Sequence, residues 1–176
     1  MGLDMYIHKK VYCGAHFEHN NMQTKVIVHK TKDDILSTIE IDSPLSSFEI
    51  QVAYWRKANA IHCWFCNNIG EQENISSEEY LPMEKIVELI AVCKEAIKLY
   101  EIHNDLTDTD FLKFANDNLP PMSGFFFGST DIDEWYLQDL RDTVEQLEKL
   151  IADHEKYENE YNKVGLYQSY YYDASW

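Results

Sequence analysis

The sequence predicts an α+β protein with a small N-terminal antiparallel sheet, three to four helices packed on it, a long C-terminal helix and a Tyr-rich tail. Three observations carry this prediction. Apolar residues alternate over the first 56 residues, recur at helical spacing from residue 54 to about residue 157, and give way to tyrosines after residue 165. The 176 residues, 45% of them hydrophobic, are enough for one core, so we expect a single domain over residues 1–176.

Four short runs near the start have the alternation of half-buried strands. They lie at residues 3–7, 26–28, 39–41 and 48–52. Turn-forming residues at 20–21, 32–34 and 42–44 separate some of these runs. Residues 33–36 have a helical turn as an alternative.

The first helix is expected to begin at Tyr54 and to end at Gly70. At 100° per residue, one stripe holds Trp55, Asn59, His62, Cys66 and Ile69, and a second holds Ile61 and Trp64. A helix that is apolar on more than one side is buried by other elements.

Two further helices follow a polar loop at residues 71–78. Pro82 fits a first helical turn, and apolar residues then recur at helical spacing to about His103. A shorter helix is expected over residues 111–116. It ends before Pro120 and Pro121, because proline cannot donate a helical hydrogen bond.

The last helix has a predicted N-cap at Thr130 and an expected end near Tyr157. Three acidic residues near its start complement the positive end of the helix dipole: Asp131, Asp133 and Glu134. Its expected buried seam is Tyr136, Leu140, Val144, Leu147, Ile151 and His154. The tyrosine-rich tail that follows has β-propensity, so it closes back on the sheet or on a partner, with a homo-oligomer as one form of the second arrangement.

Charge and composition narrow the classes of function. The formal net charge is −16, from 31 acidic residues against 15 lysines and arginines, so binding to phosphodiester backbones is electrostatically opposed. The same charge suits a basic protein partner or serves solubility. With no apolar run of bilayer length, no leader pattern and four cysteines in apolar segments, we expect a cytoplasmic protein without a membrane anchor.

Arg56 is one of only two arginines and directly follows Tyr54 and Trp55. A guanidinium beside aromatic rings pairs with a phosphate or carboxylate while a base stacks on the rings, and Lys57 adds a second positive charge. A structural ion pair with one of the many carboxylates is the alternative. Asn59 and His62 lie on the apolar stripe. Each is expected either to form hydrogen bonds with a ligand or to complete a hydrogen-bond network in the core.

The loop at residues 124–130 places Phe125, Phe126 and Phe127 between glycines, directly before a helix. Free N–H groups at a helix N-terminus suit an anion, and an exposed ring stacks on a base or on a partner protein. Acidic residues at the same helix end oppose a phosphate. The alternative is a buried aromatic loop under the last helix.

Metal and catalytic motifs are weak. Cys63 and Cys66 form a C-x-x-C inside a helix, and Cys13, His16 and His19 have ligand-like spacing, but no second pair completes a zinc motif. No nucleophile elbow, phosphate-binding loop or dinucleotide-binding glycine pattern is present, so we assign no catalytic residue, metal or cofactor. If the protein is an enzyme, His62 with a neighbouring carboxylate is the acid–base pair to test.

Several sequence blocks resemble a family of uncharacterised small proteins common in bacteriophage and bacterial genomes. They are MGLDMY at residues 1–6, YWRKAN-x-IH-x-WF at 54–65, GFFFGST-x-x-DEWY at 124–136 and the Tyr-rich Ser/Trp end. The resemblance implies an accessory phage protein. By analogy, such proteins oppose host immunity by sequestering nucleotide-derived signals or by blocking a defence protein.

The leading hypothesis is a non-catalytic protein that captures a small anionic, nucleotide-derived ligand and does not bind nucleic acid directly. Its candidate ligand-binding residues are Tyr54, Trp55, Arg56, Lys57, Asn59, His62, Phe126, Phe127, Ser129 and Thr130. An acidic inhibitor that binds a host protein is the first alternative, and an enzyme that processes nucleotides is the second.

Overall fold

The computed structural model describes residues 2–14, 26–32, 35–41, 45–70 and 75–176. Four helices and a four-stranded antiparallel sheet make up most of this part of the chain, which confirms the predicted α+β class. The predicted turns at residues 20–21, 33–34 and 42–44 lie outside the described residues.

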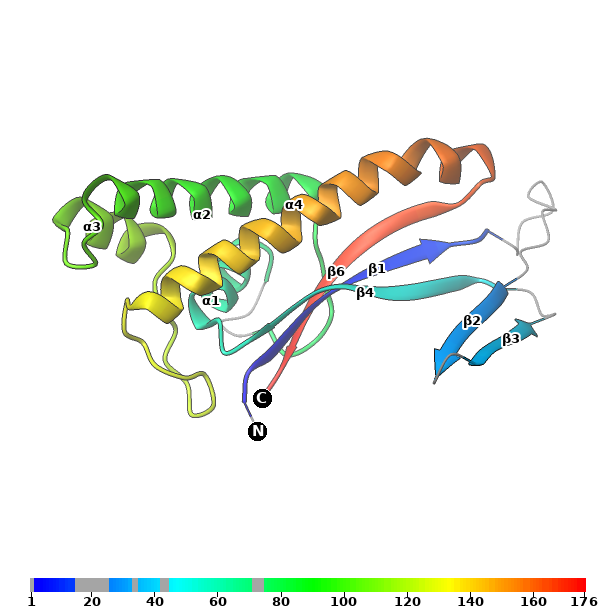
Figure 1. Ribbon diagram of the computed structural model, residues 1–176, viewed down its shortest axis with the longest axis horizontal. Helices are drawn as coiled ribbons and strands as arrows, with labels where there is room; N and C mark the ends of the chain where they lie inside the picture. The colour runs from blue at the N-terminus through cyan, green and yellow to red at the C-terminus, as the bar shows by residue number, and fades with distance from the viewer. Residues whose placement is uncertain (1, 15–25, 33–34, 42–44, 71–74) are drawn as a thin grey trace.

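The sheet has the order β4-β1-β6-β5, and every neighbouring pair is antiparallel. The strands are β1 (Asp4–Tyr12), β4 (Ser47–Arg56), β5 (Glu79–Tyr80) and β6 (Tyr167–Ser175). The Tyr-rich tail therefore closes back on the sheet, as one of the two predicted arrangements requires, and it does so as an inner strand. In Figure 1 the two chain ends lie together because β1 and β6 run side by side in opposite directions.

A separate two-stranded ribbon pairs β2 (Val26–Lys32) with β3 (Ile35–Ile41). Ile35 and Leu36 belong to β3, so the helical-turn alternative is wrong for these two residues. The alternation correctly identified the strands of the ribbon, but they pair with each other rather than with the four-stranded sheet. Period-two alternation marks a strand and carries no information about its partner.

The helices are α1 (Asn59–Asn68), α2 (Met83–His103), α3 (Thr109–Asn118) and α4 (Glu134–Lys163). In Figure 1, α4 runs obliquely along one side of the sheet and α2 lies alongside it. The predicted end of α2 at His103 is confirmed, but Pro82 is the extended N-cap of this helix and not part of its first turn. α3 ends before Pro120 as predicted, but it spans Thr109–Asn118 and so extends beyond the expected residues 111–116 at both ends.

The predicted start of the first helix is wrong. Tyr54, Trp55 and Arg56 are the last residues of β4, and Lys57 then adopts a left-handed backbone conformation with φ of 63°. Trp55 lies opposite Met5 in the ladder, so its apolar side chain follows the alternation of a strand rather than a helical stripe. The rest of the proposed stripe belongs to α1.

The predicted limits of the last helix are also wrong. Asp133, not Thr130, is the N-cap, because its carboxylate accepts hydrogen bonds from the backbone N–H groups of Trp135 and Tyr136. The helix continues to Lys163, beyond the apolar seam that ends near Tyr157. Its tyrosines continue the contact with the sheet after the aliphatic residues stop, as the stacked rings of Tyr157 and Tyr161 over Lys9 show.

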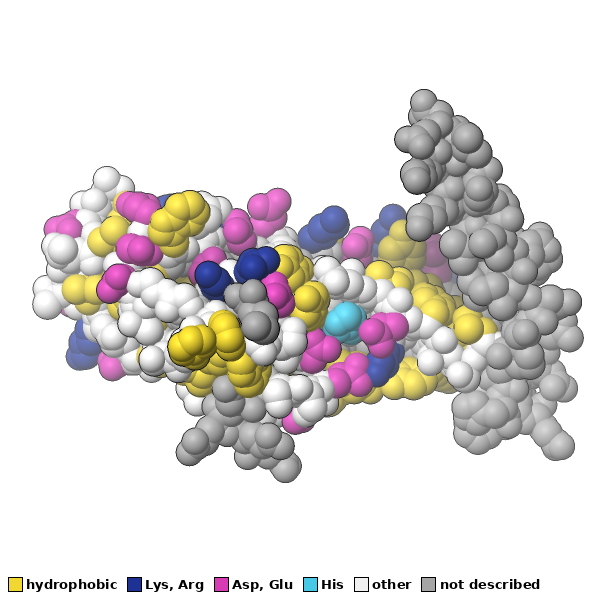
Figure 2. Space-filling view, turned by 90° about the horizontal axis from the view of Figure 1, so that it is seen from below, with side chains coloured by type: hydrophobic (Ala, Val, Ile, Leu, Met, Phe, Trp, Pro, Cys, Tyr) yellow, Lys and Arg dark blue, Asp and Glu magenta, His cyan; other side chains and the backbone are white. Residues whose placement is uncertain are grey.

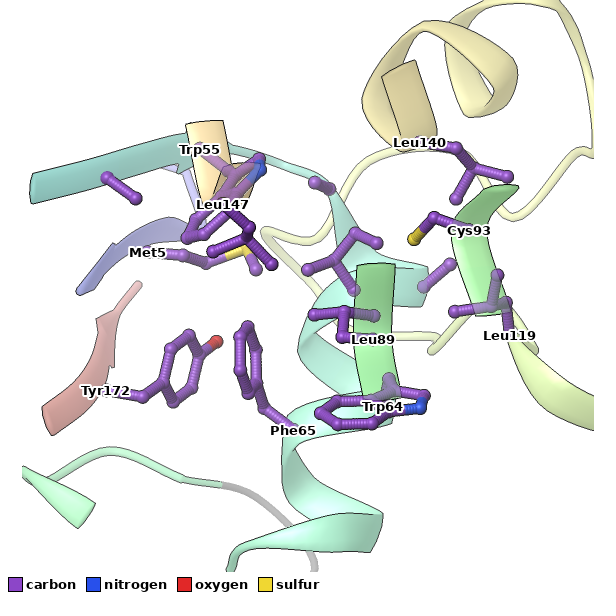
Figure 3. Close-up of a cluster of buried hydrophobic side chains, with 14 of the residues drawn as sticks. Met5, Trp55, Trp64, Phe65, Leu89, Cys93, Leu119, Leu140, Leu147 and Tyr172 are labelled. Carbon is purple, nitrogen blue, oxygen red and sulfur yellow. The ribbon is translucent and has the colours of Figure 1, made fainter. Parts of the chain in front are cut away.

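The main core lies between the sheet and the helices. In Figure 3, Tyr172 of β6 faces Phe65 of α1, and their rings stack with centroids 4.0 Å apart. Met5 and Trp55 come from the same face of the sheet, while Leu89 and Leu140 come from helices. β6 thus contributes both a strand and a central aromatic ring to the core.

Shortening the chain by residues 167–176 tests this arrangement. Removing β6 leaves the backbone groups of one edge of β1 unpaired and opens the core at Tyr172, so we expect loss of cooperative unfolding. The measurement is thermal unfolding followed by near-ultraviolet circular dichroism. Removing Trp176 alone is the control, and it should leave a cooperative transition; a folded protein without β6 would contradict the topology.

Candidate functional site

The turn between β4 and α1 places two basic side chains at the surface. The backbone N–H of Lys57 donates to the carbonyl of Leu3 at 2.7 Å, which holds the left-handed turn against the start of β1. Arg56 and Lys57 are both exposed, and their side chains pass close to Gly2. Figure 2 shows basic side chains gathered beside hydrophobic and acidic ones on this face of the molecule.

The aromatic loop at residues 124–130 is held against this turn. Asn59 donates from its side-chain amide to the carbonyls of Phe127 and Ser129, at 3.1 and 2.7 Å. The N–H of Leu3 donates to the carbonyl of Phe126 at 3.1 Å. The two segments that the sequence singled out, 54–62 and 124–130, therefore lie together.

A pocket of about 450 Å³ opens between the turn, the loop and the first turns of α4. Its walls are formed by Arg56, Lys57, Asn59, Ala60, Gly128, Ser129, Asp131, Asp133, Trp135, Tyr136 and Asp139. Gly128 has φ of 93°, and a β-carbon there would lie 3.4 Å from the Lys57 side chain. Glycine at this position therefore accommodates the positive φ that the turn requires.

The two cations of the pocket, Arg56 and Lys57, have no ion-pair partner in the part of the chain that the structure describes. Among the described residues, no acidic side chain forms an ion pair with Arg56 or Lys57, although acidic residues outnumber basic ones twofold in the chain. Two of the pocket carboxylates already accept internal hydrogen bonds, since Asp133 caps α4 and Asp131 accepts from the Ser129 hydroxyl at 2.7 Å. The structural ion pair considered for Arg56 is thus not found in this part of the chain.

Asp139 is a carboxylate of the pocket whose pKa is raised. Burial, followed by the nearby carboxylates Asp142 and Asp133, raises the pKa of Asp139 to about 7. A neutral Asp139 donates a hydrogen bond and an ionised one accepts, so this wall of the pocket changes character near neutral pH.

Several predicted ligand-binding residues lie in the interior instead of in the pocket. Trp55 is 4% exposed and donates from Nε1 to the Thr143 hydroxyl at 2.9 Å. His62 is fully buried, and its Nδ1 lies 2.6 Å from the Tyr172 hydroxyl, so it satisfies the core network that was its alternative. Tyr54 is partly exposed on the other face of the sheet, where its hydroxyl donates to Asp4.

The three phenylalanines of the loop have different environments. Phe127 is 3% exposed and packs edge-on against His62, which agrees with a buried aromatic loop for this residue. Phe126 is half-buried, whereas Phe125 is 95% exposed. Ser129 lines the pocket, and Thr130 is exposed outside its lining. The helix N-terminus proposed for an anion is already occupied by the Asp133 carboxylate.

Two residues that sequence reasoning did not select belong to this site. Trp135 is 78% exposed and presents its ring at the pocket. It belongs to the DEWY part of the sequence block at residues 124–136, and membership of that block is the feature of the sequence that could have identified it. Nothing in the sequence marks Asp139 as a site residue, because it reaches the lining of the pocket only through the packing of α4 beside the β4–α1 turn.

No group of three or more candidate metal ligands occurs among the described residues. Cys63 and Cys66 are buried in α1, and burial raises the pKa of both thiols. His16 and His19 lie outside the described residues.

Comparison of the chain with known protein families, curated proteins and solved structures finds no match. In the described part of the chain, no helix combines the length and apolarity needed to cross a bilayer. The expected role of this site therefore depends on its own chemistry.

Replacing Asp139 by Asn should change how stability depends on pH. Because the folded-state pKa lies above that of an aspartate in an unfolded chain, the folded protein binds more protons between about pH 4 and 7. The stability that Asp139 contributes is complete below about pH 4 and is lost as the pH rises to about 7. Relative to the wild type, Asp139→Asn should therefore gain stability across this interval.

The measurement is the free energy of unfolding in urea at several pH values between 4 and 8. Asp117→Asn, at an exposed carboxylate of α3, is the control and should shift stability equally at every pH. A constant difference between wild type and Asp139→Asn would show that Asp139 titrates normally.

Proposed function

We propose that this protein binds and sequesters a small anionic, nucleotide-derived ligand in the pocket beside Arg56 and Lys57. The observation that supports this most is the pair of basic side chains facing a pocket with no ion-pair partner among the described residues of a chain of net charge −16. Placing two like charges together is unfavourable unless an anion joins them.

The form of the pocket agrees with a ligand of mixed character. Its volume of about 450 Å³ falls in the range typical of small-molecule sites. Arg56 and Lys57 suit a phosphate, and the exposed ring of Trp135 offers a face on which a base stacks. On the acidic side of the pocket, Asp131 and Asp139 offer oxygens to the N–H donors of a base.

The buried members of the predicted set have a positioning role in this proposal. Asn59 ties the aromatic loop to α1, and Trp55 ties the end of β4 to α4. They keep the turn that carries Arg56 beside the loop that carries Ser129. Preorganised walls reduce the entropy lost on binding.

The biological setting proposed here rests on the resemblance to accessory proteins of phages and bacteria. A protein of this kind withdraws a nucleotide signal in the host cytoplasm and so opposes a defence response, without chemical turnover. Capture requires only that the bound state be more stable than the free one.

A second candidate function is inhibition of a host protein through direct contact. Phe125 favours it, because a phenylalanine that is 95% exposed is typical of a protein-binding anchor. This candidate predicts binding to a protein partner that depends on Phe125 and not on a small molecule. The nucleotide-processing alternative differs from both because it predicts product.

Arg56→Ala should abolish capture while leaving the fold intact. A charge-assisted hydrogen bond contributes about 1.5–3 kcal/mol, so the dissociation constant should rise at least about tenfold. The measurement combines mass spectrometry of small molecules released by denaturing the purified protein with thermal shifts against cyclic and linear nucleotides.

Lys113→Ala is the matched control, since it removes one exposed positive charge from α3 and should leave binding unchanged. Intact recovery of the released molecule supports capture, and conversion to product supports an enzyme. If no nucleotide is retained or shifts the melting temperature, the capture proposal fails.

A further inference from the structure

Lys9 occupies a core position of the sheet. Its neighbours of the same parity on β1, Met5, Ile7 and Val11, are fully buried, and Lys9 itself is 6% exposed. The ladder places it between Ile50 of β4 and Tyr170 of β6. Lysine is rarely this deeply buried, because removing an ammonium group from water is costly unless a partner compensates for it.

The partners of Lys9 within the protein are aromatic faces, not hydrogen-bond acceptors. Its Nζ lies 5.3 Å from the ring centroid of Tyr161 and 5.7 Å from that of Tyr157. Among the described residues, no acceptor lies within hydrogen-bonding distance of this nitrogen and no carboxylate forms an ion pair with it. Cation–π contacts stabilise the charge only partly, and they leave the donors of the amine without acceptors.

A second pocket, of about 370 Å³, opens at this amine. Its lining includes apolar side chains at Val52 and Leu150, a carboxylate at Asp153 and a second, exposed amine at Lys149. It involves no residue of the Arg56–Lys57 pocket. A buried amine, a surface cation and apolar walls therefore meet at one cavity.

We propose that Lys9 is a nucleophilic amine that forms an imine with a small anionic aldehyde, whose anionic group is held by Lys149. This site is separate from the proposed nucleotide pocket and does not depend on it. Schiff-base lysines in proteins are activated by desolvation in apolar surroundings, as Lys9 is here.

The electrostatics agree with this chemistry. Burial lowers the pKa of Lys9, and the charges of Asp153 and Tyr157 oppose that shift without reversing it. A larger fraction of the amine is then neutral near neutral pH than for an exposed lysine. The other ionisable groups that face the pocket are Lys149, Tyr161 and Tyr170.

The reaction balances without an oxidant or a reductant. The neutral nitrogen of Lys9 attacks the aldehyde carbon, the carbonyl electron pair moves to oxygen, and transfer of one proton from the nitrogen to that oxygen gives a carbinolamine. The carbinolamine hydroxyl group then takes up a proton and leaves as water, the nitrogen lone pair forms the C=N bond, and the nitrogen releases its remaining proton, so no net proton is consumed. Asp153 lines the same pocket and is placed to transfer these protons as the intermediate forms and breaks down.

The test uses pyridoxal phosphate as an anionic aldehyde probe. The full-length protein is incubated with less than one equivalent, the imine is trapped with borohydride, and the labelled lysines are mapped by peptide mass spectrometry. We expect labelling of Lys9 to be faster than that of the exposed Lys94 and Lys98, because a buried amine with a lowered pKa has a larger neutral fraction than an exposed one. Equal or slower labelling of Lys9 would overturn the proposal.

Two variants separate reactivity from structure. Lys149→Ala should slow the labelling of Lys9 by pyridoxal phosphate but not by propanal, which carries no anionic group. Lys9→Met should remove the fast-labelled site while the melting temperature stays the same or rises, because a buried apolar side chain replaces an incompletely compensated amine. A large fall in melting temperature, together with slow labelling of the wild type, would make Lys9 a structural cation–π partner instead.

Discussion

The insertion of β6 between β1 and β5 is the constraint on which the rest of the structure depends. Tyr172 of β6 stacks on Phe65 and lies within hydrogen-bonding distance of His62, so the strand fixes the position of α1. The first residue of α1 is Asn59, which holds the aromatic loop through two hydrogen bonds. The pocket beside Arg56 is therefore assembled by a chain of contacts that begins at the last strand.

The two proposed sites use positive charge in opposite ways. Arg56 and Lys57 are exposed neighbours in the lining of their pocket, an arrangement suited to attracting an anion to a predominantly negative protein. Lys9 is buried among tyrosines, where the interior weakens its hold on a proton. Neither site has the residues that stability alone would favour. An aliphatic residue would be more stable at the core position of Lys9, and a carboxylate would be more stable than a second cation beside Arg56.

Much of the secondary structure could be predicted because apolar spacing reports burial directly. α2 shows this best, as its apolar residues and Asn104 mark its extent and its end. The start of α1 could not be predicted in this way, because Trp55 fits the apolar positions of both a strand and a helix, and the positive φ of Lys57 leaves no mark in the sequence. The residues that line the pocket were even harder to predict from the sequence. Arg56 is indicated by the rarity of arginine in this chain and Lys57 by its position next to Arg56, whereas Asp139 joins them only through the packing of α4.

The pairing of β1 with β6 also affects how the chain matures. Asp4 pairs with Ser175, so β1 is synthesised long before β6 and cannot form its ladder with that strand until β6 has been made. Until then the apolar face of β1 has only β4 as a sheet neighbour, and contacts this distant in sequence form slowly because loop closure costs entropy. During synthesis, the nascent chain thus passes through a stage in which Met5 and Ile7 lack their neighbours on β6, and chaperone binding or premature association with another chain would compete with folding at this stage.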